Sequence, residues 1–461
     1  MCLGMAQEVL LILDVVMLLV SSYVAYECIR EKEQRASILS SIGVGFHLVL
    51  IYLTLYVPSL IWMVYAYYAV LAAGLLFFLI PRSPNMRAQQ GLRGYAVEEI
   101  IMPDEEDNVG SRKRLKPGSE KYKKYYERFP ELEADDLVRR NVKRVGGAVD
   151  DGYRPNMAMS RASFKLPYFM TPIAYAAPFE EIEPQKLSPE KTTMIVKNLA
   201  LHLGAKLVGV CKVDPMCIYS HSRATRPDKW TIDGEEVDYP PYALVMATEM
   251  NHEHVNSAPH TPTAAETANQ YANGAYISTV IAHWFSGMGY TGIAEHTGHY
   301  DAVLPPLAVQ AGLGEVGRNG YLITPGMGGR VRLCAVLTDM PLVLDKPRDM
   351  GVEEFCRYCK KCAITCPSKS IPDGDMVVHR GVEKWKVNAD TCSDYWDVVG
   401  TDCAICMAIC PFSKPDTPIH TAVRWFIEHS RFAPRFFPII DDILYGTTWR
   451  PKPVSDWIKY D

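Results

Sequence analysis

The chain begins with three long apolar runs, and the remainder has the mixed polar and apolar pattern of a soluble protein. The runs cover Val9–Tyr26, Ile38–Val57 and Leu60–Ile80. Each is close to the roughly 20 residues that an α-helix needs to cross the hydrocarbon core of a bilayer. Only an uncharged break at Pro58 separates the second run from the third. The pattern predicts a membrane anchor of three transmembrane helices within residues 1–93.

Basic residues predict how these helices are oriented. Three lie between the first and second runs and three follow the third run: Arg30, Lys32, Arg35, Arg82, Arg87 and Arg93. Loops rich in Lys and Arg stay in the cytoplasm. Residues 1–8 carry neither Lys nor Arg, which argues against a secretory signal peptide. We therefore expect a multi-pass protein of the cell membrane with its large C-terminal domain on the cytoplasmic side.

Strand and helix patterns alternate in the soluble part. Four elements are expected: helix Ser188–Leu203, strands Lys206–Val213 and Tyr242–Met250, and helix Ala272–Met288. Ser188 and Pro189 are typical of the N-cap and the first position of a helix. The alternation predicts a layered α/β domain. The charge-rich residues 94–151 are expected to form a surface segment between the anchor and this domain.

The cysteines restrict the range of possible functions more than the overall composition does. A net charge of −5 over 461 residues gives no basic surface for a nucleic acid. Eight of the 13 cysteines fall between Cys356 and Cys410 at short spacings, unlike a disulfide framework. The other five are isolated, and we expect them to be small buried hydrophobic residues: Cys2, Cys28, Cys211, Cys217 and Cys334.

The eight clustered cysteines match the motif of bacterial ferredoxins with two [4Fe–4S] clusters. The second motif lacks its first cysteine, and Cys392, which lies upstream, can fill the vacancy. The fourth cysteine of each motif ligates the other cluster. One predicted ligand set is Cys356, Cys359, Cys362 and Cys410, and the other is Cys366, Cys392, Cys403 and Cys406. Zinc sites use two separated pairs of ligands and fit this pattern poorly.

Two clusters provide a path for electrons but do not define a reaction. The run Gly312-Leu-Gly-Glu-Val-Gly317 superficially resembles a dinucleotide-binding loop. No clear strand pattern precedes it, so this match is weak. The identity of the electron acceptor therefore has to come from other parts of the sequence.

The residues from about Lys113 to the C-terminus resemble the corrinoid-dependent reductive dehalogenases. The matching motifs, besides the two cysteine motifs, are Phe129-Pro130-Glu131 and Asp135-Asp136 within 121–139, Gly204-Ala205, Tyr219-Ser220, Met288-Gly289-Tyr290, the block 311–318, Thr324-Pro325, the block 330–333, Asp441-Asp442 and Tyr445-Gly446. The three apolar runs resemble the small membrane-anchor protein that usually accompanies such enzymes, here in the same chain.

This resemblance implies an α/β fold with a nitroreductase-like core and a ferredoxin-like domain. The expected division is a membrane anchor (1–93), a linker and extension wrapping the core (94–187), a corrinoid-binding catalytic core (188–345), a 2[4Fe–4S] domain (346–415) and a C-terminal segment packing on the core (416–461). The implied corrinoid is cobalamin bound base-off. The sequence has no Asp-x-His-x-x-Gly pattern, which supplies a lower histidine ligand to cobalt in another class of cobalamin proteins.

The implied activity is that of an oxidoreductase, in which an organohalide R–X takes up two electrons and a proton to give R–H and halide. The family's proton donor is a tyrosine that precedes a Gly-Tyr pair, here residues 289–290, and Tyr271 occupies its place. Arg332 matches the partner arginine, which is expected to hold the phenolate by a charge-assisted hydrogen bond. The alternatives to these two residues are Tyr276 and Arg330.

The sequence departs from some relatives just after the Gly-Tyr pair. Those relatives place an asparagine near the halogen, whereas Thr297 stands at about that position here. His296 and His299 flank it, and neither is given a catalytic role, because a lone histidine near a loop is more often structural. The departure leaves the substrate open and the reaction class unchanged.

The resemblance also implies partners: a small organohalide, a low-potential electron donor (a membrane quinol system, ferredoxin or flavodoxin) and membrane lipid, with no nucleic acid. One alternative is another corrinoid iron–sulfur reductase, of the epoxyqueuosine reductase kind. The membrane spans, and Tyr271 where that class uses an aspartate, argue against it. A second alternative is a non-catalytic membrane-bound electron carrier, which leaves the α/β domain unexplained.

Overall fold

The structure is a computed structural model of the 461-residue chain. It describes residues 5–142, 148–178, 183–220, 230–232, 235–237 and 239–460. The chain divides into two compact units, each assembled from separate segments. Unit 1 comprises Met1–Pro84, Glu354–Cys359 and Asp416–Thr448, and unit 2 comprises Asn85–Glu353, Lys360–Pro415 and Trp449–Asp461.

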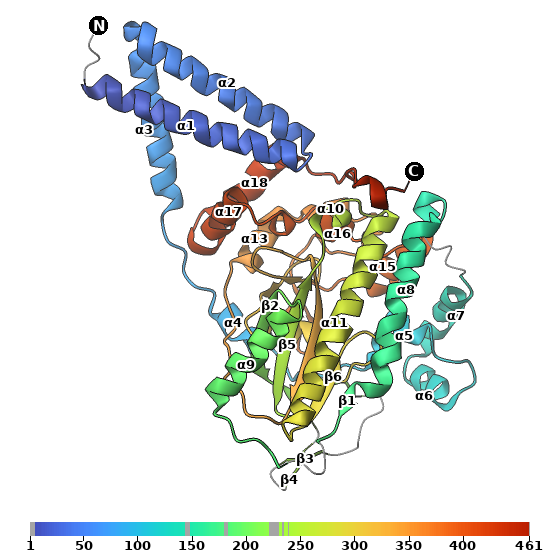
Figure 1. The fold of residues 1–461 in the computed structure, drawn as a ribbon. Coiled ribbons are helices and arrows are strands. Elements are labelled where there is room, and N and C mark those ends of the chain that lie inside the picture. Colours follow the sequence, from blue (N-terminus) through green and yellow to red (C-terminus); the bar gives the residue numbers. More distant parts are fainter. Residues whose placement is uncertain are drawn as a thin grey trace. The chain divides into compact units, whose positions relative to one another are not determined.

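Unit 1 is built almost entirely of helices (Figure 1). The main helices are α1 (Met5–Arg30), α2 (Gln34–Tyr56), α3 (Ile61–Phe78), α17 (Pro418–His429) and α18 (Ala433–Tyr445). A short 3-10 turn, Pro58–Leu60, separates α2 from α3. α1, α2 and α3 are long and apolar enough to cross a membrane. The three apolar runs in the sequence thus correspond to three helices.

Polar side chains within these apolar helices are paired with one another. Asp14 is fully buried, and its two carboxylate oxygens accept hydrogen bonds from Thr54 and Tyr68, each of 2.7 Å. His47 Nε2 lies 3.0 Å from the hydroxyl of Tyr67. Polar groups in a membrane segment are expensive unless they have partners. These contacts explain how α1, α2 and α3 accommodate them.

The C-terminal helices α17 and α18 pack against the N-terminal segment within unit 1. The rings of Phe77 and Phe432 stack with their centres 4.0 Å apart. His420 Nε2 lies 2.9 Å from a carboxylate oxygen of Glu31. The segment 416–461, expected to pack as a whole on the core, is therefore divided between the two units, with only its last 13 residues, Trp449–Asp461, in unit 2.

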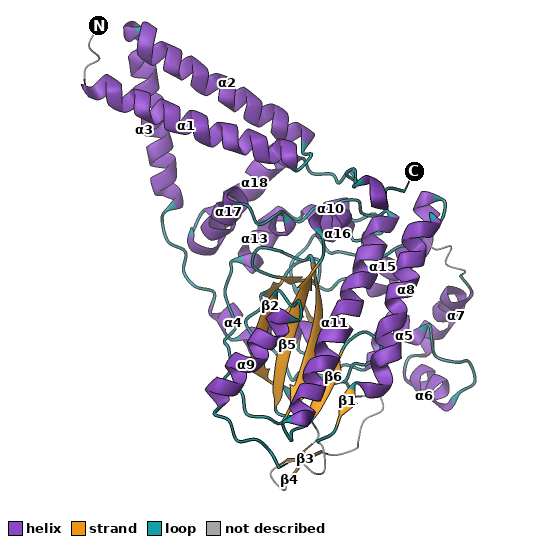
Figure 2. Ribbon diagram, in the orientation of Figure 1, coloured by secondary structure: helices purple, strands orange, loops and turns teal. Residues whose placement is uncertain are grey.

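Unit 2 contains a five-stranded sheet (Figure 2). Its strands are β1 (Tyr175–Ala176), β2 (Leu207–Lys212), β5 (Tyr242–Glu249), β6 (Gly292–Glu295) and β9 (Val331–Thr338). The order is β1-β6-β9-β5-β2, and every neighbouring pair is antiparallel. β2 and β5 are the two strands that the apolar runs predicted. The mixed α/β class is thus confirmed.

Helices cover both faces of this sheet. α9 (Pro189–His202) and α11 (Thr261–Gly287) pack on one face through residues such as Val196 and Ile281. α12 (Leu304–Gln310) packs on the other face through Leu307. α8 (Arg154–Met170) runs alongside α11 (Figure 1). Because both faces are covered, the central strands are buried on both sides and read as continuous apolar runs.

α11 begins 11 residues earlier than the sequence predicted. Its first half is rich in Ala and Thr and holds few large apolar side chains. Nearly all of those small residues are nevertheless buried, because small side chains allow close packing of α8 against α11. Periodicity of large apolar residues, on which the prediction relied, gives no signal in such a segment.

The remaining elements of unit 2 are short. They include α4 (Met86–Gln89), α5 (Val109–Arg112), α6 (Glu120–Arg128), α7 (Glu133–Asn141), α10 (His252–Val255), α14 (Lys361–Thr365), α15 (Ala389–Val399), α16 (Ile405–Ala408) and the hairpins β3–β4 (Trp230–Ile232, Glu235–Val237), β7–β8 (Glu315–Val316, Leu322–Ile323) and β10–β11 (Val377–His379, Val382–Lys384). α13 (Val352–Cys359) contributes residues to both units.

The charge-rich segment before the core is docked rather than merely exposed. The buried Arg112 pairs with Asp136 at 2.8 Å. Lys113 pairs with Asp397 of α15 at 2.6 Å. The acidic and basic residues that suggested a surface linker therefore hold α5 and α7 together and hold α5 on α15.

The isolated cysteines behave as expected wherever they are described. Four of them are buried and form no disulfide bond with another described residue: Cys28, Cys211, Cys217 and Cys334. Cys2 lies outside the described residues.

Candidate functional site

The two residues predicted to carry the chemistry meet in unit 2. Tyr271 comes from α11 and Arg332 from β9. The guanidinium carbon of Arg332 lies over the Tyr271 ring, 5.1 Å from its centre, within the range of a cation–π contact. Arg332 also donates hydrogen bonds to Thr267 Oγ1 (3.0 Å) and to the carbonyl oxygen of Val331 (3.2 Å). The predicted pair is thus brought together, but Arg332 lies over the face of the Tyr271 ring and does not make the expected hydrogen bond to the phenol oxygen.

Arg332 is held as a buried cation. Burial favours its neutral form, but the nearby phenols of Tyr271 and Tyr321 and the carboxylate of Asp402 raise the pKa of Arg332. Its Nε is buried and has no hydrogen-bond partner among the described residues. Burial raises the pKa of Tyr300 and of Tyr321 well above 10. Both phenols therefore stay protonated, and a charged guanidinium sits among neutral phenols.

The two alternative residues are placed elsewhere. Tyr276 follows Tyr271 on α11 but is 43% exposed. Arg330 is buried and donates hydrogen bonds to the carbonyl oxygens of Ser413 (2.6 Å) and Met250 (2.7 Å). Its guanidinium therefore holds backbone segments together. Among the predicted candidates, the geometry favours Tyr271 with Arg332.

Four cysteines of unit 2 lie close enough for their charges to interact. They are Cys366, Cys392, Cys403 and Cys406, which form one of the two predicted ligand sets. Burial and the neighbouring thiols, including that of Cys362, raise the pKa of Cys406. Cys403 and Cys392 show the same coupling to Cys366. The other predicted set takes Cys356 and Cys359 from unit 1 and stays a prediction.

Tyr321 is close to both this cysteine group and the Tyr271–Arg332 pair. Burial raises the pKa of its phenol, and the charges of Cys406, Arg332 and Tyr271 also act on it. Tyr321 packs against the buried cluster that contains Met407. Nothing in the spacing of the sequence marked Tyr321, because it belongs to a loop and to no motif with a chemical meaning of its own.

A cavity of about 300 Å³ lies between α8, the start of α11 and the segment 400–402. Phe164, Ala264 and Asp402 line it. The Phe164 ring lies 5.8 Å from the Tyr271 ring, and Asp402 acts electrostatically on Arg332. This volume is at the lower end of the range for small-molecule pockets. The cavity thus has the size for a small molecule, and Phe164 and Asp402 connect its wall to the Tyr271–Arg332 pair.

A second cavity of about 420 Å³ lies among α12, β7 and the β10–β11 hairpin. Its wall is mostly apolar, with Val309 and Trp385 on it and charged groups such as Arg380 at its margin. It is large enough for part of a cofactor.

The glycine run 312–317 is not an open phosphate cradle. A Cβ on Gly314 would lie 2.0 Å from the carbonyl oxygen of Ile323. The side chain of Glu315 accepts the backbone N–H of Met350. The glycines therefore allow segments of the same chain to pack closely, which agrees with the weak sequence match.

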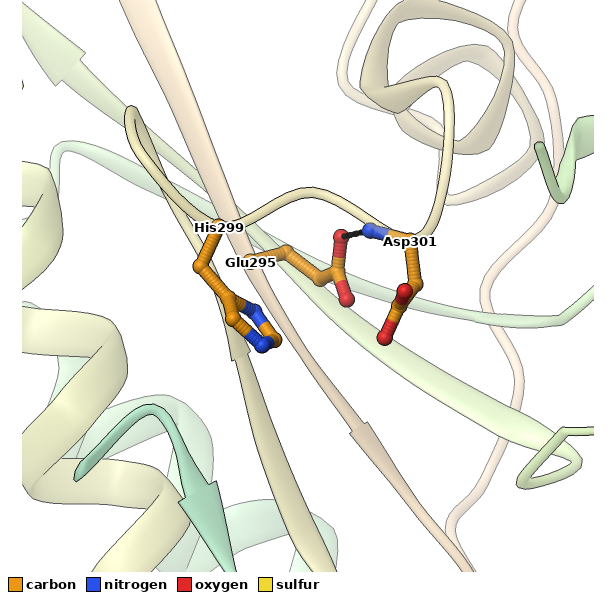
Figure 3. Close-up of side chains that lie close together, drawn as sticks. All are labelled: Glu295, His299 and Asp301. Carbon is orange, nitrogen blue, oxygen red and sulfur yellow. Dashed lines mark hydrogen bonds between the residues drawn. The ribbon is translucent and has the colours of Figure 1, made fainter. Parts of the chain in front are cut away.

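The turn after β6 places its histidines in the interior. His296 is 1% exposed, and burial lowers its pKa to about 4, so its ring is neutral at physiological pH. Thr297 Oγ1 lies 3.3 Å from the hydroxyl of Tyr300. Glu295, His299 and Asp301 face one another (Figure 3). This last grouping was not anticipated, although three ligand-type residues within seven positions gave a signal for it.

Both the sequence and the fold are similar to those of reductive dehalogenases. Over 295 residues it is 35% identical to the tetrachloroethene reductive dehalogenase of Sulfurospirillum multivorans. The match covers 57% of this chain and 58% of that protein. The solved structure of the catabolic reductive dehalogenase NpRdhA, in complex with 3-bromo-4-hydroxybenzoic acid, matches with a TM-score of 0.60 at 25% identity, over 80% of this chain and 50% of that one.

A shorter match concerns the alternative class. The epoxyqueuosine reductase of Cyclobacterium marinum is 29% identical over 117 residues, which cover 23% of this chain and 37% of that protein. No family model matches the chain. The homology with reductive dehalogenases is thus more than twice as long as that with epoxyqueuosine reductases.

Proposed function

We propose that this protein is a membrane-anchored reductive dehalogenase, an oxidoreductase that converts an organohalide R–X to R–H and halide with two electrons and one proton. The observation that carries the proposal is the stacking of the buried Arg332 on the ring of Tyr271. The 35% identity to a tetrachloroethene reductive dehalogenase supports the same reaction. The proposed substrate is a small organohalide.

Tyr271 is the proposed proton donor. Losing its proton leaves a phenolate, and the buried cation of Arg332 stabilises that charge from the ring face at 5.1 Å. Preorganised charges in a site that excludes water act more strongly than they do in bulk solvent. The hydrogen bonds from Arg332 to Thr267 and Val331 hold the guanidinium in place. Tyr271 and Arg332 together therefore form an acid with a fixed counter-charge.

Two [4Fe–4S] clusters and a base-off corrinoid are the proposed cofactors. Cys366, Cys392, Cys403 and Cys406 would hold one cluster, and Cys356, Cys359, Cys362 and Cys410 the other. Arg332 Nε and His296 Nε2 are buried without a hydrogen-bond partner in the described part of the chain, as expected where a bound group supplies one. Bound there, a corrinoid supplies a strongly reducing cobalt centre for carbon–halogen cleavage.

The contacts of Tyr321 suggest where electrons enter the site. Its phenol interacts electrostatically with Cys406 of the proposed cluster and with Arg332 and Tyr271. A cluster on Cys366, Cys392, Cys403 and Cys406 would therefore lie close to the reacting groups.

The three apolar helices are the proposed anchor in the cell membrane. The basic residues after α3 favour a cytoplasmic position for the catalytic part. The proposed electron donor is a low-potential carrier, either a membrane quinol system or a ferredoxin or flavodoxin. The proposed core and ferredoxin-like domain correspond to residues 188–345 and 346–415.

Cobalt analysis tests the cofactor assignment. The full chain, purified anaerobically in detergent and reconstituted with cobalamin, should hold about one cobalt per chain together with the iron of two clusters. A cobalt-to-protein ratio near zero in protein with full iron content would contradict the proposal and would favour the electron carrier instead.

A further inference from the structure

Glu295, His299 and Asp301 form a compact group that the proposed reaction does not use. One ligand atom from each lies within 4.8 Å of those of the other two. Their exposed fractions are 0%, 4% and 2%. Figure 3 shows the imidazole and the two carboxyl groups converging on one space beside β6. We propose that these three residues bind one divalent transition-metal ion, such as Zn²⁺ or Mn²⁺.

The turn between His296 and His299 brings the side chains of Glu295, His299 and Asp301 together. Glu295 ends β6, and the backbones of His296 and His299 exchange hydrogen bonds of 2.9 and 2.8 Å. Gly298 closes this turn with φ of +104°, a conformation that L side chains rarely adopt. The chain therefore reverses within two residues and returns the His299 side chain to the end of the strand from which Glu295 projects.

His299 is prepared to act as a ligand. Its Nδ1 lies 3.0 Å from the carbonyl oxygen of Ala294. A carbonyl oxygen only accepts, so Nδ1 is the donor, and in the neutral tautomer that makes this bond the lone pair is on Nε2. This is the arrangement by which proteins orient metal-binding histidines. Nε2 makes no hydrogen bond within the part of the chain that the structure describes, although the residue is 96% buried.

The two carboxylates complete a mixed donor set. Backbone N–H groups of Asp301 and Ala302 donate to Glu295 Oε2 at 2.8 and 3.1 Å, which orients the Glu295 side chain. Two carboxylates buried this close together repel each other unless a cation or a shared proton neutralises them. Two oxygens and one imidazole nitrogen leave a coordination position open, as in sites with three protein ligands.

The distances permit binding after a small adjustment. Ligand atoms around a tetrahedral ion with bonds of about 2.1 Å lie roughly 3.4 Å apart. The three side chains must therefore draw together by about an ångström. An ion there would fix the turn that carries Thr297 and Tyr300, and Tyr300 is close enough to Tyr271 for their charges to interact. Its role would be to position the wall of the site.

Manganese binding tests the proposal directly. Mn²⁺ is the preferred probe because it favours oxygen and imidazole donors over the thiolates of the cluster cysteines. The cluster-loaded full chain in detergent should remove about one equivalent of Mn²⁺ from the free-ion electron paramagnetic resonance signal. His299→Gln and Asp301→Asn should each weaken this binding at least about tenfold, and excess Zn²⁺ should compete in the wild type.

The matched control is His296→Gln, which alters the other buried histidine of the same turn and should leave Mn²⁺ affinity unchanged. Iron content and the midpoint of thermal unfolding show whether each variant is folded. Mn²⁺ should raise that midpoint in the wild type and in His296→Gln, in which the three ligands are intact, but not in His299→Gln or Asp301→Asn. Absence of saturable Mn²⁺ and Zn²⁺ binding in folded wild type would overturn the proposal in favour of a carboxyl pair sharing a proton. So would equal binding in a folded Asp301→Asn. The result does not depend on halide release, so its failure leaves the proposed dehalogenase activity standing.

Discussion

At Tyr271 a single hydroxyl group carries the proposed proton transfer. A free phenol has a pKa near 10, so it is a useful acid only where its phenolate is stabilised, and Arg332 is the buried cation that does so. Tyr271→Phe removes the hydroxyl and keeps the ring. We expect the rate of halide release with a low-potential reductant to fall by at least about 100-fold, with cobalt and iron contents preserved.

Tyr276→Phe is the matched control for this substitution. Tyr276 lies on the same helix, and its side chain is 43% exposed, so removal of its hydroxyl should leave halide release near the wild-type rate. An unchanged rate in Tyr271→Phe, or equal losses in both variants, would show that Tyr271 is not the proton donor.

Glu266 is a second residue whose ionisation has a measurable consequence. Burial opposes its charge, but hydrogen bonds from His254, the Asn251 backbone and Gln270 lower the pKa of Glu266. A depressed pKa in the folded state stabilises the protein above the unfolded-state pKa, near 4.3, and that contribution is lost as the pH falls through the folded-state value. Glu266→Gln should therefore reduce the free energy of unfolding by about 1–3 kcal/mol at pH 7.

Denaturant unfolding at pH 7 and at pH 4 measures this effect. The difference between wild type and Glu266→Gln should shrink at the lower pH, because wild-type Glu266 then begins to take up a proton. Glu190→Gln, at an exposed position in the first turn of α9, should change little at either pH. A Glu266→Gln difference of the same size at both values would contradict the linkage.

At the scale of elements, the sequence predicted helices and strands most accurately where a single local feature determines them. Ser188 caps α9 by accepting the backbone N–H of Lys191, and Pro189 follows it, so that helix start was found. β2 and β5 were found because both of their faces are buried. The first half of α11 was missed because its buried residues are small. The cysteine spacing could be read directly, since cluster ligands must lie close together in sequence and space.

A substitution can test whether Cys392 is the cluster ligand that replaces the missing first cysteine of the second motif. Serine is a poorer iron ligand than cysteine, so Cys392→Ser should lose one cluster and reduce iron from about eight to about four atoms per chain. Iron analysis of anaerobically purified protein provides the measurement. Cys211→Ala, which alters a buried cysteine of β2, should keep the full iron content. Full iron in folded Cys392→Ser would mean that another residue completes the set.

Contacts between residues far apart in the sequence could not be predicted from local sequence patterns. Tyr271 and Arg332 are 61 positions apart, and only the resemblance to a family paired them. Tyr321 and Asp402 join that site from a loop and from the segment before α16, and no spacing rule marks either residue. The group Glu295, His299 and Asp301 depends on a turn whose geometry is set by Gly298.

At the scale of the whole molecule, the chain combines three helices able to cross a membrane with an α/β unit whose relatives are reductive dehalogenases. It spans 58% of the length of the first of these relatives. Unit 1 joins the N-terminal helices to α17 and α18, so this compact unit combines segments that lie far apart in the sequence. The proposed activity is therefore a property to be measured on the full chain.

Halide release from the full chain tests the central claim most directly. The protein, loaded with cobalamin and iron and supplied with a low-potential reductant, is incubated with a panel of small organohalides, and halide and dehalogenated product are measured together. The account predicts release of one halide for each R–H formed from at least one compound. No halide release from any of them, in protein with full cobalt and iron contents, would contradict it.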